Sequence, residues 1–144
     1  MTSNTISRKA DPQAQKGLGF SSGQLVQEFY WDEDVDEQLR RAIVDSTGED
    51  LIDSEDTNLV DGVIVWWRAD DAEVDDLADV LIDAVGNLDN GGLVWVLTPK
   101  PGKSNHVAPA DIEEAAGTAG LHPTSTTTVG PEWAGTRLSA PARQ

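Results

Sequence analysis

Three aspartates in the first half of the chain have a spacing that is used to bind metal ions. Asp32, Asp34 and Asp36 form the pattern D-x-D-x-D, which opens a calcium-binding loop. Such a loop needs glycine at its sixth position for a sharp turn and glutamate at its twelfth as a bidentate ligand. The sequence has Glu37 and Ile43 at those positions, so the pattern does not predict a calcium site.

Residue types that act as nucleophiles or zinc ligands are scarce. The chain has no cysteine, which excludes a thiolate nucleophile, a disulfide and an iron–sulfur cluster. Its two histidines, His106 and His122, lack the H-x-x-x-H or H-E-x-x-H spacing of a zinc site. No serine lies in a nucleophile elbow: residues 19–23 read G-x-S-x-G, but they precede the first predicted strand as an entry loop, whereas the elbow follows a strand. We therefore predict no catalytic residue and no metal, and interpret both histidines as solvated loop residues.

The charge of the chain is strongly negative and unevenly distributed. The formal net charge is -16 at pH 7, and residues 23–90 contain twenty-one acidic and three basic side chains. A field of this sign repels phosphate backbones, so direct nucleic-acid binding is not expected. Three explanations of the acidity stay open: solubility, an acidic docking face for a partner, and adaptation to a salty cytoplasm.

The hydrophobic runs of the chain are too short to span a membrane, and its length suits one folded domain. No segment reaches the roughly 18 apolar residues of a membrane span, and residues 1–11 are polar where a signal peptide is apolar. We therefore expect a cytoplasmic protein that does not interact with membranes. Residues 1–16 lack periodic hydrophobicity and are predicted to be a disordered tail. Residues 17–141 have the length of a single domain, followed by a short tail over 141–144.

The elements that position any site alternate between apolar strands and amphipathic helices. The strands predicted at 60–67 and 91–98 contain unbroken apolar runs, at 63–67 and 93–97, which are typical of parallel strands covered by helices on both faces. A strand over 24–31, a helix over 34–46 and a short strand over 50–52 are predicted before them. The sequence therefore predicts an α/β fold built around a mostly parallel sheet.

The second half of the chain adds two helices and a hairpin to this pattern. A helix is predicted from Asp70, with an apolar stripe of Val74, Leu77, Val80, Leu81, Ala84 and Val85. A second helix begins at Pro109 and is capped at Gly120, and strands over 124–129 and 136–139 form a C-terminal antiparallel hairpin. The residues expected in the core are Val63, Val65, Leu77, Leu81 and Trp95.

Several segments resemble a known family. Residues 18–24 (LGFSSGQ), 97–100 (LTPK) and 132–138 (EWAGTRL) are similar to segments of an actinobacterial family of unknown function, the domain of unknown function number 3052. The whole pattern over 17–141 looks like the Rossmann-like sheet of adenosylmethionine-dependent methyltransferases. That resemblance implies the strand order 2-1-3-4-6-5 with strand 6 antiparallel, in a degenerate methyltransferase-like fold.

The methyltransferase resemblance implies a site for the cofactor, and the sequence has only part of the residues that such a site needs. Such an enzyme has a glycine-rich loop after its first strand and a carboxylate after its second. Asp53, Glu55 and Asp56 could hold the ribose, but the glycine loop is replaced by the bulky, acidic segment 30–34. We therefore expect no cofactor and no binding of adenosylmethionine or nicotinamide dinucleotides. A methyltransferase-like enzyme or small-molecule sensor with a divergent cleft is the alternative.

Two of the five tryptophans, Trp31 and Trp133, lie beside turns and acidic groups. An aromatic side chain with one solvent-exposed edge can anchor a partner there. Because both acidic helices start at the carboxyl edge of the sheet, their carboxylates are expected to converge on one rim. We predict a regulatory or protein-binding module that docks a partner with a basic surface. The predicted partner-binding residues are Trp31, Asp32, Asp34, Asp36, Asp70, Asp71, Asp75 and Trp133.

Overall fold

The computed structural model describes residues 17–140, apart from the side chain of Asn90. The tails predicted over 1–16 and 141–144 lie outside the described residues. In chain order the elements are β1 (Val26–Phe29), α2 (Glu37–Thr47), β2 (Val60–Trp66), the 3₁₀ helix η2 (Ala69–Glu73), α3 (Leu77–Val85), β3 (Leu88–Pro99), α4 (Pro109–Thr118), β4 (His122–Val129) and β5 (Trp133–Ser139).

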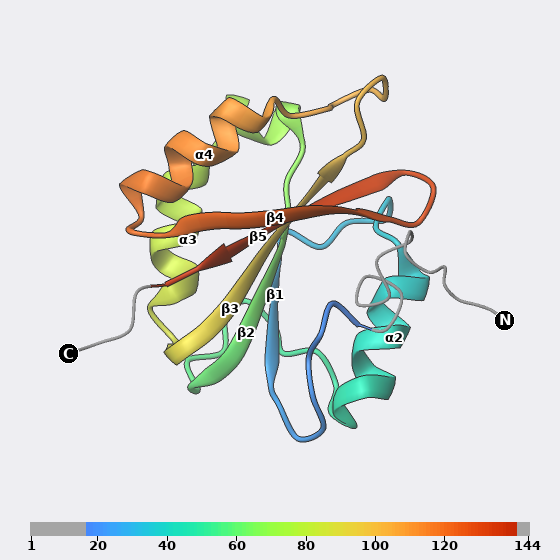
Figure 1. Cartoon of the computed structure of the whole chain (residues 1–144), viewed down its shortest axis with the longest axis vertical. Coiled ribbons are helices and arrows are strands. Elements are labelled where there is room, and N and C mark those ends of the chain that lie inside the picture. The colour runs from blue at the N-terminus through green and yellow to red at the C-terminus, as the bar shows by residue number, and fades with distance from the viewer. Residues whose placement is uncertain (1–16, 141–144) are drawn as a thin grey trace, which may run out of the picture.

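These strands form one sheet in the order β1-β2-β3-β5-β4 (Figure 1). The strands β1, β2 and β3 are parallel, whereas β5 is antiparallel to both β3 and β4. Beyond β1, a parallel bridge joins Gln27 to Ile52, where the sequence predicted a short second strand. With that bridge counted as strand 2, the predicted order and the antiparallel sixth strand are confirmed. The fold is a mostly parallel α/β sheet with a C-terminal antiparallel hairpin.

A side chain, rather than strand pairing, fixes the segment after this bridge. Gln27 is fully buried, and its Nε2 donates hydrogen bonds of 2.9 Å to the carbonyl oxygens of Asp53 and of Asp56. The Asp53 Oδ1 accepts a hydrogen bond from the Glu55 amide at 2.9 Å, which turns the chain away from β1. The predicted second strand is therefore reduced to one bridge.

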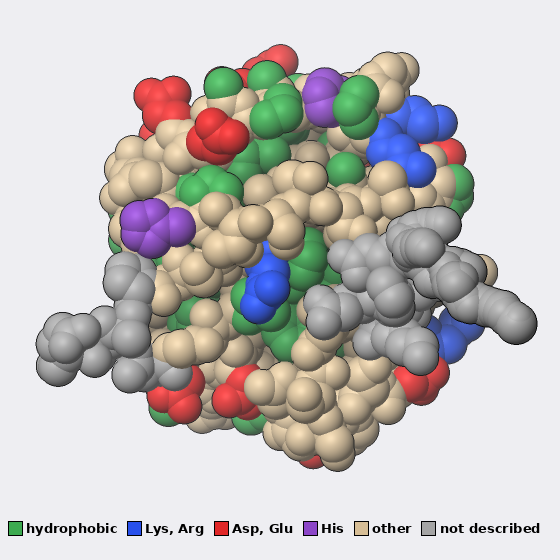
Figure 2. All heavy atoms as spheres, in the orientation of Figure 1, with side chains coloured by type: hydrophobic (Ala, Val, Ile, Leu, Met, Phe, Trp, Pro, Cys, Tyr) green, Lys and Arg blue, Asp and Glu red, His purple; other side chains and the backbone are tan. Residues whose placement is uncertain are grey.

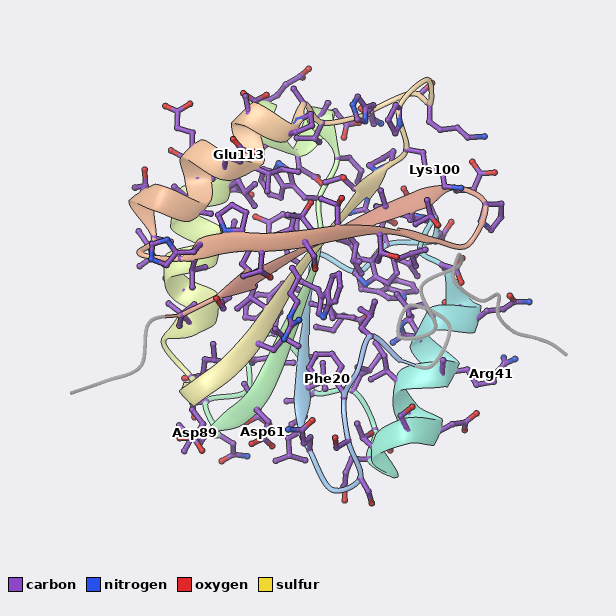
Figure 3. The ribbon with its side chains drawn as sticks, viewed as in Figure 1. Phe20, Arg41, Asp61, Asp89, Lys100 and Glu113 are labelled. Atoms are coloured by element: carbon purple, nitrogen blue, oxygen red, sulfur yellow. The ribbon has the colours of Figure 1, made fainter. Side chains whose placement is uncertain are left out.

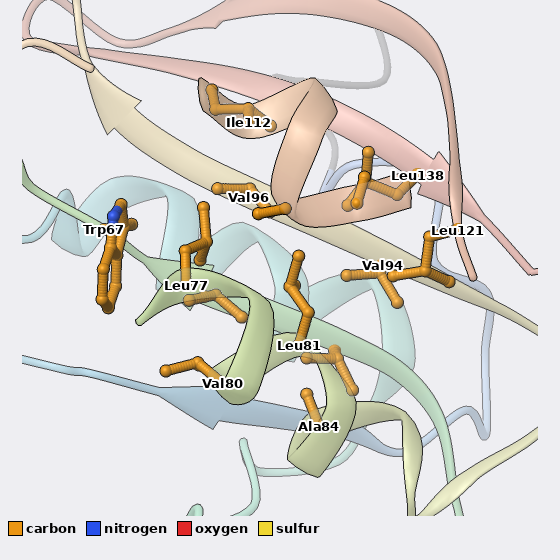
Figure 4. Close-up of a cluster of buried hydrophobic side chains, with 14 of the residues drawn as sticks. Trp67, Leu77, Val80, Leu81, Ala84, Val94, Val96, Ile112, Leu121 and Leu138 are labelled. Carbon is orange, nitrogen blue, oxygen red and sulfur yellow. The ribbon is translucent and has the colours of Figure 1, made fainter. Parts of the chain in front are cut away.

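Helices cover both faces of the sheet, with α2 on one face and α3 and α4 on the other (Figure 1). Figure 4 shows Leu77 and Leu81 of α3 against β3, next to Ile112 of α4. All five residues predicted in the core, Val63, Val65, Leu77, Leu81 and Trp95, are buried, so that prediction is confirmed. The two most apolar strands lie side by side in the centre of the sheet, in parallel register.

Aspartate caps place both acidic helices later in the chain than the sequence predicted. The Asp36 Oδ1 accepts from the Leu39 amide at 2.9 Å, so α2 begins at Glu37. The Asp76 Oδ1 accepts from the Ala78 amide at 3.0 Å, so α3 begins at Leu77. The prediction that Val74 belongs to the buried stripe is wrong, because it lies before this cap and is 83% exposed.

Two kinds of feature do not occur in the described part of the chain. Within residues 17–140, no helix is long and apolar enough to cross a membrane. The same residues contain no group of three or more His, Asp or Glu side chains placed to hold a metal ion.

Candidate functional site

The segment that follows β1 has an unusual backbone at the carboxyl edge of the sheet. Tyr30 has a φ angle of 62°, in the left-handed region that favours glycine. Its hydroxyl donates a hydrogen bond of 2.5 Å to the Asp75 Oδ2, and its ring packs edge-to-face on Trp67 with centroids 5.2 Å apart. Where a cofactor-binding fold places glycine, this chain therefore holds a bulky side chain in a fixed position.

A buried arginine, Arg68, joins the loop after β1 to the loop after β2. It is 6% exposed, and its Nη1 donates to the carbonyl oxygens of Tyr30 at 2.9 Å and of Trp66 at 3.1 Å. Its Nε donates to the Asp34 Oδ2 at 3.0 Å, its Nη2 pairs with the other oxygen of Asp34, and its Nη1 lies 3.5 Å from Asp71. We call these contacts the Arg68 network.

The Arg68 guanidinium remains charged in this environment. Burial lowers its pKa, but the hydrogen bond and charge of Asp34 and the charge of Asp71 raise it, and the pKa ends above its ordinary value. A permanent cation held by two carboxylates and two carbonyl groups fixes the loop 30–34 across the ends of β1 and β2.

Trp133 lies underneath this network and is not exposed. It is 3% exposed, its Nε1 donates to the Asp34 carbonyl oxygen at 3.1 Å, and its ring lies 5.3 Å from the Arg68 guanidinium carbon. The prediction that one edge of Trp133 is exposed to solvent is therefore wrong. The residue starts β5 rather than lying in a turn, and it packs edge-to-face on Trp66. We exclude it from the candidate surface.

The structure brings the two predicted acidic segments together. The Arg68 network joins Asp34 to Asp71, and Tyr30 joins the same region to Asp75. Asp36 and Asp76 are used as helix caps. The exposed residues left at this edge, which we call the acidic rim, are Trp31, Asp32, Glu33, Asp70, Glu73 and Asp75.

Within the rim, the side chains differ in how far they are already engaged. The exposed fraction of Trp31 is 50%. Asp32 accepts a hydrogen bond from the Glu33 backbone amide, and the Asp70 Oδ2 accepts one from the side-chain Nδ2 of Asn105 at 3.4 Å. Glu33 and Glu73 are exposed and use their carboxylates in no hydrogen bond or salt bridge among the described residues. A surface that has a half-exposed tryptophan and carboxylates without a partner suits a cation with an apolar part.

The position of Tyr30 predicts an abnormal titration, which is measurable because the chain has only one tyrosine. Burial, the hydrogen bond to Asp75 and the neighbouring carboxylates raise the pKa of Tyr30 to about 12. We expect tyrosinate absorbance in the folded protein to appear with a midpoint near that value, against about 10 in urea. Because Tyr30 keeps its proton to a higher pH in the folded state, its contribution to stability is fully present below about pH 10. That contribution is lost as the pH rises from about 10 to 12.

Asp75→Asn is the control for this titration. The variant keeps a hydrogen-bond acceptor but removes a charge, so the pKa of Tyr30 is expected to decrease. A midpoint close to 10 in the folded wild-type protein would contradict the packing of Tyr30 described above.

A second buried polar cluster lies beside the first, under α2. Glu28 in β1 is 9% exposed, and its carboxylate accepts from the Arg40 Nε and Nη2 at 2.8 Å each and from the Trp66 Nε1 at 2.8 Å. The hydrogen bonds that Arg40 donates to Glu28 raise the pKa of Arg40. This cluster was not predicted from the sequence, although a glutamate inside an apolar strand is a signal for it, because a buried carboxylate needs a partner.

Of the three predicted ribose-binding residues, Asp53 alone lines a cavity of about 560 Å³ beside β1. Its lining includes Asp53 together with Glu28, Tyr30, Trp31 and Arg40, whereas Glu55 and Asp56 lie in the adjoining turn. These residues do not suit adenosylmethionine: Tyr30 and Trp31 stand where a glycine loop would let the backbone approach it, and the lining carries the carboxylates of Glu28 and Asp53. The guanidinium of Arg40 is already paired with Glu28.

Another cavity, of about 510 Å³, adjoins the acidic rim between η2, the start of α3 and α4. Trp67, Leu77 and Val107 supply apolar walls, and the carboxylates of Asp75, Asp76, Asp111 and Glu114 lie around it, with no lysine or arginine in the lining. His106 also lines it, and its Nδ1 donates to the Pro99 carbonyl oxygen at 2.9 Å. The cavity therefore combines an apolar interior with negative charge.

The chain is similar to a described family and to mycobacterial proteins. A family model described as "Protein of unknown function (DUF3052)" matches residues 14–142. Uncharacterized proteins of Mycobacterium bovis and Mycobacterium tuberculosis are 47% identical over 124 residues, which is 86% of this chain and 76% of each relative. The family resemblance stated from the sequence is confirmed.

Solved structures confirm the fold. A chain of the complex between the Haloferax volcanii Trm112 methyltransferase activator and the putative methyltransferase matches with a TM-score of 0.59 and 13% identity, covering 92% of this chain and 89% of that chain. An adenosylmethionine-dependent methyltransferase from Aquifex aeolicus gives 0.54 and 13%, covering 91% and 94%. The pyocyanin biosynthetic protein PhzM gives 0.61 and 10%, covering 83% of this chain, which spans about half (51%) of PhzM. The fold is methyltransferase-like.

Proposed function

We propose that this chain, which belongs to the DUF3052 family and has a methyltransferase-like fold, is a non-catalytic module that binds a basic segment of a partner protein. The observation that carries this proposal is the Arg68 network. It holds Tyr30 and Asp34 across the edge where such folds bind cofactors, and it joins the two acidic segments into one rim.

The charge of the acidic rim supports a basic partner. Like charges that crowd one edge raise the free energy of the folded monomer, and an approaching cation relieves that repulsion. Glu33 and Glu73 are free for this role, because neither serves as a cap or pairs with Arg68. Trp31 supplies the aromatic contact that often dominates the affinity of an interface.

The cavity next to the rim supports the same class of partner. A lysine or arginine side chain has an apolar stem and a charged end, and the cavity offers apolar walls together with Asp111 and Glu114. One similar structure is a complex of a putative methyltransferase with an activator protein, which supports the idea that folds of this type assemble with proteins.

Stopped-flow binding of a fluorescent lysine- and arginine-rich peptide tests the proposal. Screening shortens from about 8 Å at physiological salt to about 3 Å at 1 M, so the association rate is expected to fall steeply with salt. Trp31→Ala is expected to speed dissociation by about tenfold or more while it changes association little. An association rate that does not depend on salt would contradict the proposal.

A pair of charge-reversal variants separates a specific rim from general acidity. Glu33→Lys with Glu73→Lys changes the net charge as much as Asp45→Lys with Glu49→Lys, two exposed positions at and just beyond the C-terminal end of α2. We expect the rim variant to lose peptide binding and the α2 variant to retain most of it. Equal losses of peptide binding in the two variants would mean that the acidic residues serve solubility and form no specific binding surface.

The cavity beside Asp53 favours a second candidate function, a methyltransferase-like enzyme or small-molecule sensor with a divergent cleft. Similar solved structures include magnesium protoporphyrin IX methyltransferase with bound SAM, which supports looking for an adenosine-type ligand. Calorimetry with adenosylmethionine decides between the candidates. Micromolar binding that Asp53→Ala abolishes would favour the second candidate, and the first predicts no heat of binding.

A further inference from the structure

One arginine in the described residues keeps an enclosed donor without a partner. Arg137 lies in β5, in register with Trp95 of β3 and Ser125 of β4. Its Nε is shielded from solvent and makes no hydrogen bond with the described residues, and its guanidinium forms no salt bridge with any of them. The other two arginines of the described chain that are not fully exposed, Arg40 and Arg68, are both paired with carboxylates. In a chain with 26 acidic residues, an unpaired guanidinium points to a ligand that is not part of the protein.

Arg137 lines a cavity of about 250 Å³ at the amino edge of the sheet, opposite the acidic rim. Phe20 and Leu93 are its apolar walls, and Gly91 and Gly92 bring backbone rather than side chains to its surface. Figure 3 shows Phe20 next to β1 and Asp61 at the starting end of β2. From the same side, Figure 2 shows a hollow in which a Lys or Arg side chain lies with hydrophobic side chains around it.

Asp61 adds a negative charge to the same cavity. Its Oδ2 accepts a hydrogen bond from the Leu25 amide at 2.8 Å, but it forms no salt bridge among the described residues. Arg137 and Asp61 therefore line one cavity with opposite charges and do not pair with each other. A ligand that carries both charges satisfies the two side chains together, whereas a phosphate would be repelled by Asp61.

We propose that this cavity binds a small α-amino acid, with its carboxylate on Arg137 and its ammonium group near Asp61. A guanidinium presents a planar fork of donors that matches a carboxylate. The volume is below the 300–1,000 Å³ of typical drug-sized sites, which suits a ligand of this size. Phe20 and Leu93 would contact an apolar side chain of the ligand. The proposal is independent of the basic partner, which binds the opposite edge.

The test is nuclear magnetic resonance titration of the full chain with each of the twenty protein amino acids at millimolar concentration. We expect at least one apolar amino acid to shift the Arg137 Nε–H signal. Its N-acetyl derivative and its decarboxylated amine, which each keep one charge, are expected to bind at least about tenfold more weakly. If no amino acid shifts that signal, or if the N-acetyl derivative binds equally well, the proposal is wrong.

Variants separate the two charges. Arg137→Gln is expected to weaken binding by about a hundredfold, and Arg41→Gln, which changes an exposed arginine on α2, is expected to leave it unchanged. Asp61→Asn keeps an acceptor for the Leu25 amide, so it guards against loss of folding. It is expected to remove the preference for the amino acid over the N-acetyl derivative. A preference that survives in Asp61→Asn would overturn the proposed orientation.

Discussion

Replacing Arg68 by alanine is expected to lower the free energy of unfolding by about 2–4 kcal/mol, because a buried side chain and its hydrogen bonds to two carbonyl groups are lost. The substitution leaves the carbonyl groups of Tyr30 and Trp66 without their side-chain donor and empties the space above Trp133. It also frees the loop that carries Trp31 and Asp34. Urea denaturation followed by tryptophan fluorescence measures the change.

Arg41→Ala is the matched control for this experiment. Arg41 is exposed on α2 and takes part in no salt bridge of the described residues, so its removal is expected to change stability by no more than about 0.5 kcal/mol. If Arg68→Ala is as stable as Arg41→Ala, the guanidinium does not hold the carboxyl edge closed. The loop 30–34 would then be free to move and admit a cofactor.

Leu81→Ala is expected to cost about 2–5 kcal/mol, because it leaves a cavity in the core between the sheet, α3 and α4. Leu81 is fully buried and belongs to the cluster that contains Val94 and Val96 of β3 (Figure 4). Urea denaturation measures the loss in the free energy of unfolding. An unchanged slope of that free energy against urea concentration would show that the fold is retained.

Ile82→Ala supplies the comparison for Leu81→Ala on the same helix. Ile82 follows directly in the sequence but is 46% exposed, so its truncation is expected to cost less than about 1 kcal/mol. Similar losses at the two positions would mean that α3 is rotated relative to the packing described above.

The central sheet was predictable because its signals are local. The apolar runs that contain Val65 and Val96 have no polar residue to face solvent, which is possible only for strands covered on both faces. Pro109 at the first position of α4 marked a helix start in the same way. The strand order came from the resemblance to methyltransferases rather than from periodicity, and the pairing of the strands confirms it.

The errors arose where long-range contacts or caps decide the structure. Val74 continues the helical period, but the Asp76 side chain caps the helix after it. Trp133 looks exposed in the sequence because glycine and proline surround it, yet its partners are Arg68 and the carbonyl group of Asp34, 99 residues away. Likewise, Tyr30 shows its importance only through φ and through Asp75, 45 residues later. Periodicity contains no information on such contacts.

The most direct measurement of the central claim is a pair of nuclear magnetic resonance titrations on the full chain, one with a lysine- and arginine-rich peptide and one with adenosylmethionine. We predict that the peptide shifts the Trp31 indole signal and the amides of Glu33 and Glu73, and that adenosylmethionine shifts none of them. The contrary result, in which adenosylmethionine shifts Trp31 and Asp53 while the peptide leaves the rim unchanged, would contradict the account and assign the carboxyl edge to a cofactor.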